Sequence, residues 1–290
     1  MKPIKLSENL NLVPVKIQMR FDDVELAIGT AFFYEYKTTT HLVTNWHNLS
    51  GRNPKTKEPL HSRGTIPNNL VVDVPYHIER EGVTGIQWKR HVLSLYKDAA
   101  MLESEYCVHP SHGENVDLAT YPISGLEETV IVPANAKRLE LCDIELRPSL
   151  DVFVLGYPLG MSGGASLPIW KRGSIATEPG IDLDKLPKFL IDTATRQGMS
   201  GSPVYAQETG FFHEEGKTGL ENAILGTGRR FAGIYSGRLG DDTFQAQLGI
   251  VWKTLAIEET IEHSLKRQLE DGLRALAASK ATTSSTVGPL

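Results

Sequence analysis

Short runs of apolar and β-branched residues, separated by polar turns, recur along most of the chain. Residues 13–20 and 25–34 flank the polar turn Phe21-Asp22-Asp23 and predict two adjacent strands. Further strands are expected at 41–46, 70–74, 85–88, 151–157, 168–175, 189–191, 203–205, 229–236 and 248–252. Runs of this length and spacing predict an all-β body.

The C-terminal segment has a different period. Apolar residues recur at helical spacing, with charged residues between them: Ile257, Ile261, Leu265, Leu269, Leu273 and Leu276. We expect a helix over residues 256–279 that packs on the β body, with its last turns free to meet a partner. Residues 280–290 are rich in Ser and Thr and are expected to be disordered.

Two longer polar segments interrupt the strand pattern. Residues 51–69 contain Lys, Pro, Asn and Arg and predict a loop. Residues 206–228 contain several glycines and predict a mobile insertion near the site or at a partner contact. Residues 123–140 are the expected crossing between two domains.

Composition limits the class of protein. A chain of 290 residues suggests one large or two modest domains, and its net charge of −5 gives no reason to expect a nucleic-acid or membrane partner. No apolar run has the length of a transmembrane helix, and the N-terminus lacks the apolar core of a secretory signal. Cys107 and Cys142 are expected to be free thiols, so the expected location is the cytoplasm.

The stretch Arg196-Gln197-Gly198-Met199-Ser200-Gly201-Ser202-Pro203 is the main candidate for chemistry. It follows an apolar strand, and its glycines allow a tight turn that exposes Ser200. Backbone N–H groups of Gly198 and Ser200 could then stabilise an oxyanion. Taken alone, the stretch is equally compatible with an ordinary Gly-Ser turn.

Two further candidates lie upstream. His47 stands at the exit of the strand expected at 41–46, and Asp117 lies between it and Ser200. The order His, Asp, Ser differs from the subtilisin order and from that of α/β-hydrolases. The α/β-hydrolase elbow also needs Gly two residues after the nucleophile, where this chain has Ser202.

Four segments together resemble the trypsin-like (chymotrypsin-fold) serine peptidases, particularly bacterial intracellular enzymes with an HtrA-like catalytic domain. The segments are Gly29–Phe32 with Leu42–His47, Val116–Ala119, Gly156–Gly160 and Ile191–Pro203. The resemblance implies two antiparallel Greek-key β-barrels with the active site in the cleft between them. Residues 1–130 would carry His and Asp, residues 131–255 would carry Ser, and the helix would follow.

The resemblance also assigns roles. His47, Asp117 and Ser200 would form the catalytic triad, and Gly198 and Ser200 the oxyanion hole, with no metal or cofactor. Ala194 would lie at the floor of the substrate pocket, with Ser236 and Gly249 at its walls, which favours small or medium apolar residues before the scissile bond. Met199 replaces the Asp that pairs with a new N-terminus in digestive relatives, so regulation by a partner or by loop ordering is expected instead of zymogen cleavage.

Some alternatives remain open at this stage. Asp98 competes with Asp117 for the acid position, although Leu118-Ala119 and Pro122 fit the family strand better. Besides a serine endopeptidase that acts on proteins or peptides, the same residues suit a peptide-binding pseudoenzyme or an esterase. An activating partner protein is a further expectation.

Overall fold

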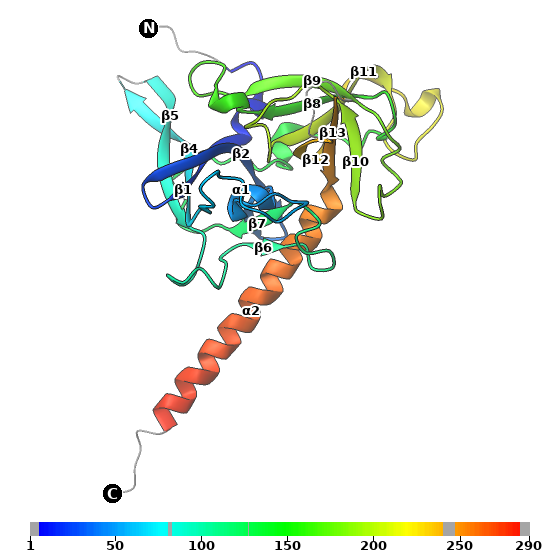
Figure 1. Cartoon of the computed structure of the whole chain (residues 1–290). Coiled ribbons are helices and arrows are strands. Elements are labelled where there is room, and N and C mark those ends of the chain that lie inside the picture. Colours follow the sequence, from blue (N-terminus) through cyan, green and yellow to red (C-terminus); the bar gives the residue numbers. More distant parts are fainter. Residues whose placement is uncertain (1–5, 81–82, 127, 240–246, 285–290) are drawn as a thin grey trace, which may run out of the picture.

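The structure is a computed structural model that describes residues 6–80, 83–126, 128–239 and 247–284. It consists of two β units that lie side by side and a long C-terminal helix (Figure 1). No helix in the described part of the chain is long and apolar enough to cross a membrane. The expected all-β body with a C-terminal helix is thus confirmed.

The first unit is a seven-stranded sheet with the order β5-β4-β1-β2-β3-β7-β6. Its pairings are antiparallel throughout. Its strands are β1 (Pro14–Phe21), β2 (Val24–Tyr36), β3 (Thr39–Thr44), β4 (Asn69–Arg80), β5 (Val83–Ser94), β6 (Cys107–Val108) and β7 (Ala119–Pro122). A short helix, α1 (Trp46–Ser50), follows β3.

The second unit is a closed barrel with the order β10-β13-β12-β11-β8-β9. Its strands are β8 (Asp151–Gly156), β9 (Ile169–Ile175), β10 (Lys188–Asp192), β11 (Pro203–Phe212), β12 (Ile224–Arg238) and β13 (Leu248–Lys253). Short 3₁₀ helices lie at Asn9–Leu12, Lys137–Leu139, Pro158–Gly160 and Leu220–Asn222.

The two units differ in closure, although the family resemblance implied two barrels. The edge strands of the first sheet, β5 and β6, do not pair with each other within the described residues. The chain between them runs through turns, and β6 has only two residues, too few for a ladder along β5. Apolar side chains such as Ile17, Phe33 and Leu70 nevertheless gather into one core on the inner face of the sheet.

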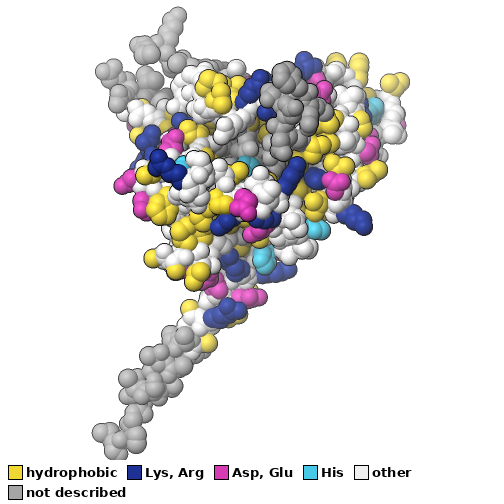
Figure 2. All heavy atoms as spheres, viewed as in Figure 1, with side chains coloured by type: hydrophobic (Ala, Val, Ile, Leu, Met, Phe, Trp, Pro, Cys, Tyr) yellow, Lys and Arg dark blue, Asp and Glu magenta, His cyan; other side chains and the backbone are white. Residues whose placement is uncertain are grey.

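The segment 206–228 is ordered into a hairpin instead of the mobile loop expected from its glycines. β11 and β12 stay paired from Pro203↔Ile234 out to Phe212↔Ile224, so the ladder extends well beyond the barrel. Apolar side chains near its tip are exposed, including Phe211 and Leu225. On the face of the molecule drawn in Figure 2, Lys and Arg side chains lie among Asp and Glu side chains.

The first half of the C-terminal helix α2 (Thr254–Ser284) packs on the β units. Ala256, Ile257 and Ile261 are completely buried in the core shared by the two units. Tyr34 donates a hydrogen bond to Glu258 at 2.8 Å, which ties the helix to β2. Figure 1 shows the rest of α2 extending away from the β units. The helix continues past the expected end at 279, and residues 285–290 lie outside the described chain.

Cys107 and Cys142 are both free, as predicted.

His41 in β3 should make folding pH-dependent. It is 1 % exposed, and burial lowers its pKa from 6.5 to about 4. The unfolded chain therefore binds a proton between these values that the folded chain does not, so stability falls as pH drops through this window. Between pH 7 and pH 4, the free energy of unfolding of the wild-type chain should fall by up to about 3 kcal/mol more than that of His41→Gln. Urea denaturation at both pH values measures this, and a constant difference between the two proteins would contradict it.

Candidate active site

His47 lies in the first turn of α1 and not at the end of a strand, because β3 already ends at Thr44. The backbone N–H of His47 donates to Asp117 Oδ1 at 2.9 Å, and its Nδ1 lies 2.7 Å from Asp117 Oδ2. The first N–H groups of a helix have no acceptor within the helix, so a carboxylate there satisfies one of them. One carboxylate thus fixes both the backbone and the ring of His47.

Asp117 is almost completely buried and is held from several sides. Ser236 Oγ donates to its Oδ2 at 2.5 Å, and Asn45 Nδ2 donates to its backbone carbonyl at 2.7 Å. Burial alone would raise the pKa of this carboxyl, but the charge and hydrogen bonds of His47, with the Ser236 hydroxyl, outweigh it and lower the pKa. Asp117 is therefore a buried anion with His47 as its main partner.

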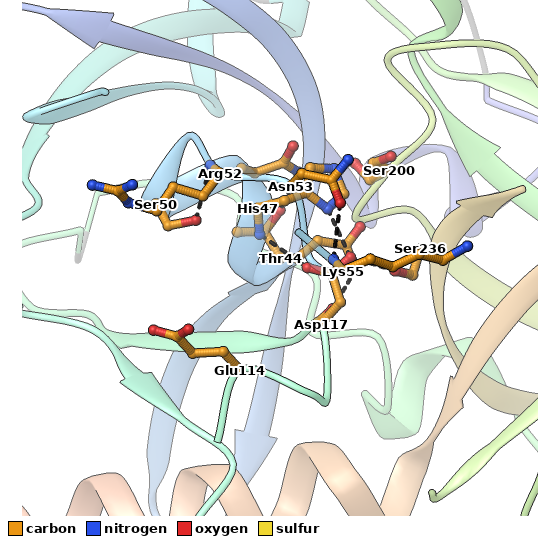
Figure 3. Close-up of polar contacts among 12 residues, drawn as sticks. Thr44, His47, Ser50, Arg52, Asn53, Lys55, Glu114, Asp117, Ser200 and Ser236 are labelled. Carbon is orange, nitrogen blue, oxygen red and sulfur yellow. Dashed lines mark hydrogen bonds and ion pairs between the residues drawn. The ribbon is translucent and has the colours of Figure 1, made fainter. Parts of the chain in front are cut away.

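Ser200 comes from the opposite unit, in the turn between β10 and β11. Two hydrogen bonds hold this turn against the first unit. Thr30 N–H donates to the Ser200 carbonyl at 3.0 Å, and Asn48 Nδ2 donates to the same oxygen at 3.2 Å. A Cβ at Gly201 would lie 1.9 Å from the Thr30 carbonyl oxygen, so only glycine permits this approach. Figure 3 shows Ser200, His47, Asp117 and Ser236 grouped where the two units meet.

The turn before Ser200 sets the direction of one peptide group. Met199 N–H donates to the Arg196 carbonyl at 3.2 Å, and Gly198 has φ +90°, the pattern of a type II turn. The Gln197 carbonyl accepts a hydrogen bond from Leu159 N–H at 2.7 Å. Because C=O and N–H point in opposite directions across a trans peptide, the Gly198 N–H faces away from Leu159. Gly198 also lines a cavity between the two units, so this donor is available to a bound group.

A cavity of about 480 Å³ lies between the two units. His47 and Asn48 line it from the first unit, and Gly198, Ser200 and Ser236 line it from the second. Within the described residues, Ser200 Oγ makes no hydrogen bond that would occupy it. The cavity therefore presents a serine hydroxyl, an imidazole oriented by a carboxylate, and a backbone N–H to one ligand.

The other predicted site residues lie elsewhere. Ala194 is exposed, and Gly249 is buried against the Tyr235 ring; neither lines the cavity. Asp98, the alternative acid, is partly exposed, and its carboxylate accepts hydrogen bonds from the Leu102 and Glu103 N–H groups. The geometry therefore places Asp117, and not Asp98, beside His47.

The sequence did not identify the residues that hold the site together. Asn48 donates to both Thr44 Oγ1 and the Ser200 carbonyl, and Thr30 Oγ1 donates to the Gly198 carbonyl at 2.8 Å. Ser236, expected at a pocket wall, lines the cavity and also contacts Asp117. The available signal for this network in the sequence was the Asn directly after His47.

The chain belongs to the family of trypsin-like peptidase domains, whose model matches residues 29–212, more than half of the chain. That family is one of serine proteases, which agrees with the resemblance drawn from the four segments.

Similar solved structures include Rv3671c from M. tuberculosis in an inactive form, with 16 % identity, a TM-score of 0.44 and 89 % of each chain covered. The serine endoprotease from Yersinia pestis has 14 % identity and a TM-score of 0.46, over 91 % of this chain and 68 % of that one. The HtrA-type protease AlgW with a tripeptide has 13 % identity and a TM-score of 0.45, over 87 % and 60 %. No match was found among curated protein sequences.

Proposed function

We propose that the chain is a serine endopeptidase in which Ser200 is the nucleophile, His47 the general base and Asp117 the residue that orients His47. The pairing of buried Asp117 with His47 Nδ1, on the wall of a cavity that also contains Ser200, is the observation that carries this proposal. With Nδ1 held by Asp117, Nε2 is the ring nitrogen left to accept a proton from the substrate side.

The reaction follows from these positions. Ser200 Oγ attacks the scissile carbonyl carbon while His47 Nε2 takes the hydroxyl proton. The tetrahedral intermediate collapses as His47 gives that proton to the leaving amine, which breaks the C–N bond and leaves an ester on Ser200. Water then attacks the ester with His47 again as base, and the acid product departs with Ser200 restored.

Backbone donors stabilise the negative charge on the carbonyl oxygen. The Gly198 N–H, directed by the Leu159–Gln197 hydrogen bond, and the Ser200 N–H supply two of them. A prearranged donor of this kind contributes about 3–4 kcal/mol to the transition state. Met199, which precedes the nucleophile, is completely buried and apolar, so this turn needs no ion pair with a newly cleaved N-terminus.

Incubation with an unfolded protein such as carboxymethylated casein tests the proposal. We expect new N-termini in the presence of the wild-type chain and none with Ser200→Ala. A folded wild-type chain that hydrolyses small esters but no peptide bond would replace the proposal with an esterase, and one that hydrolyses neither would replace it with a binding protein.

Gly198→Ala is expected to lower kcat by about 10²–10³-fold with little change in KM, because the donor would move out of place. The added Cβ would lie 2.5 Å from the Tyr157 carbonyl oxygen, at a φ that alanine rarely adopts. Gly210→Ala is the matched control, since Gly210 also has positive φ but has open space around it. Equal kcat values for the two variants would contradict the role of Gly198.

A further inference from the structure

The cavity beside Ser200 is strongly asymmetric. On the His47 side it extends between the β1–β2 hairpin and the loop 51–67. Apolar residues predominate in its lining there, namely Met19, Leu26, Ile28, Pro54, Leu60 and Pro67, and the loop also contributes the polar residues His61, Ser62 and Thr65. From the second unit, the described lining residues are those of the Ser200 turn, Gln197, Gly198 and Ser200, and a short part of β12, Ser236 to Arg238. No carboxylate of the described residues lines the cavity.

A β-bulge shapes the hairpin wall. β1 and β2 pair as Met19↔Ala27 and then Arg20↔Glu25, which leaves Leu26 as an extra residue. A bulge of this kind re-aims side chains locally, and Leu26 lines the cavity. The opposite wall is also fixed, because Leu60 N–H donates to the Gly51 carbonyl at 2.8 Å. Both walls are therefore built into the fold.

On the other side of Ser200, a tyrosine occupies the space. Tyr235 precedes Ser236 in β12 and is 1 % exposed. Its hydroxyl hydrogen-bonds Thr195 Oγ1, and its ring lies against Gly249, where an added Cβ would come within 2.5 Å of Tyr235 Cε2. The ring thus fills the volume between Thr195 and Gly249, the positions around the floor and wall that the sequence suggested for a pocket.

The chemistry identifies which side is which. In the tetrahedral intermediate the oxygen points to the Gly198 N–H, and the leaving nitrogen must come within reach of His47 Nε2. The part of the substrate after the scissile bond therefore lies on the His47 side, over α1. The acyl part takes the remaining direction, past Gly237, where an added Cβ would lie 3.9 Å from Ser200 Oγ and within 4 Å of no other described residue beyond its chain neighbours.

We propose, on the basis of the proposed function, that this chain selects substrates mainly after the scissile bond. An apolar side chain of the first or second residue on the leaving-group side fills the cavity between the β1–β2 hairpin and the loop 51–67. On the acyl side Tyr235 leaves room for small residues only. An apolar pocket discriminates by about 10–200-fold per methylene. Substrates with Leu or Phe at this position should therefore be preferred over those with Ala by at least about 10-fold.

Profiling of cleavage sites in a proteome-derived peptide library tests the proposal. The variants are Leu60→Asp, which places a charge at the partly exposed rim of the cavity, and Leu102→Asp as a matched control, because Leu102 is exposed and does not line it. We expect wild type and Leu102→Asp to favour Leu, Ile, Met or Phe in the first two positions after the cleaved bond. Leu60→Asp should lose that preference. Its kcat/KM should fall by about 10-fold or more for the best peptide and by less than about 2-fold for the same peptide with Ala at that position.

Modification of Ser200 by a fluorophosphonate, measured on the same three proteins, separates the two proposals. Labelled protein that cleaves peptides with selection only before the scissile bond would overturn the leaving-group inference and leave the peptidase proposal standing. The same holds if Leu60→Asp and Leu102→Asp give identical profiles. Folded protein that is neither labelled nor active would overturn both.

Discussion

Ser200→Ala is expected to lower kcat for peptide hydrolysis by about 10⁶-fold, since it removes the only atom that forms the acyl-enzyme. The Ser200 main chain is held by Thr30 N–H and Asn48 Nδ2 at its carbonyl, and these contacts do not involve Oγ. The variant should therefore fold normally and bind peptides with unchanged affinity. Single-turnover cleavage of a fluorogenic peptide, together with its binding constant, measures both quantities.

Ser202→Ala is the matched control for this substitution. Ser202 lies two residues away in the same turn, is completely buried and does not line the cavity. Its activity should stay within a few-fold of wild type. Full activity in Ser200→Ala would exclude the acyl-enzyme mechanism.

Asp117→Asn is expected to lower kcat by about 10⁴-fold while preserving the fold. The carboxylate accepts from the His47 backbone N–H, from His47 Nδ1–H and from Ser236 Oγ. An amide group donates where Oδ2 now accepts, so His47 would turn to the tautomer with the proton on Nε2. That nitrogen could then no longer take the Ser200 proton.

Asp98→Asn provides the control for the acid. Asp98 is partly exposed, and its carboxylate closes a local turn through the N–H groups of Leu102 and Glu103. Its kcat should change by less than about 2-fold. Steady-state kinetics at neutral pH and circular dichroism on both variants decide the assignment, and a large loss in Asp98→Asn with an active Asp117→Asn would reverse it.

Local sequence patterns predicted the strands and the candidate site because each rests on neighbouring residues. The apolar runs before His47 and before the Ser200 turn mark strands β3 and β10, and Gly198 and Gly201 mark a turn that side chains would block. The preference for Asp117 over Asp98 came from the residues around each acid, chiefly Leu118-Ala119, and the structure places Asp117 beside His47.

Features that depend on distant contacts could not be predicted from the sequence. That His47 lies in the first turn of a helix depends on Asp117, 70 residues away, accepting its N–H. The filling of the space near Gly249 by Tyr235 depends on β12 pairing with β13 and on Thr195 meeting the hydroxyl. The hairpin β11–β12 is stabilised by its own long ladder. The glycines of 206–228 favoured a loop there, so the sequence did not predict this ladder.

The most direct measurement is the site of covalent labelling by a fluorophosphonate. We predict one adduct per chain, located on Ser200 in the wild type, because Ser200 lines the same cavity as His47, whose ring is paired with Asp117. Labelling should disappear in Ser200→Ala and slow sharply in Asp117→Asn, as read by mass spectrometry of the intact chain and its peptides. A folded wild-type chain labelled on another serine, or not labelled at all, would contradict the assignment of Ser200 as the nucleophile.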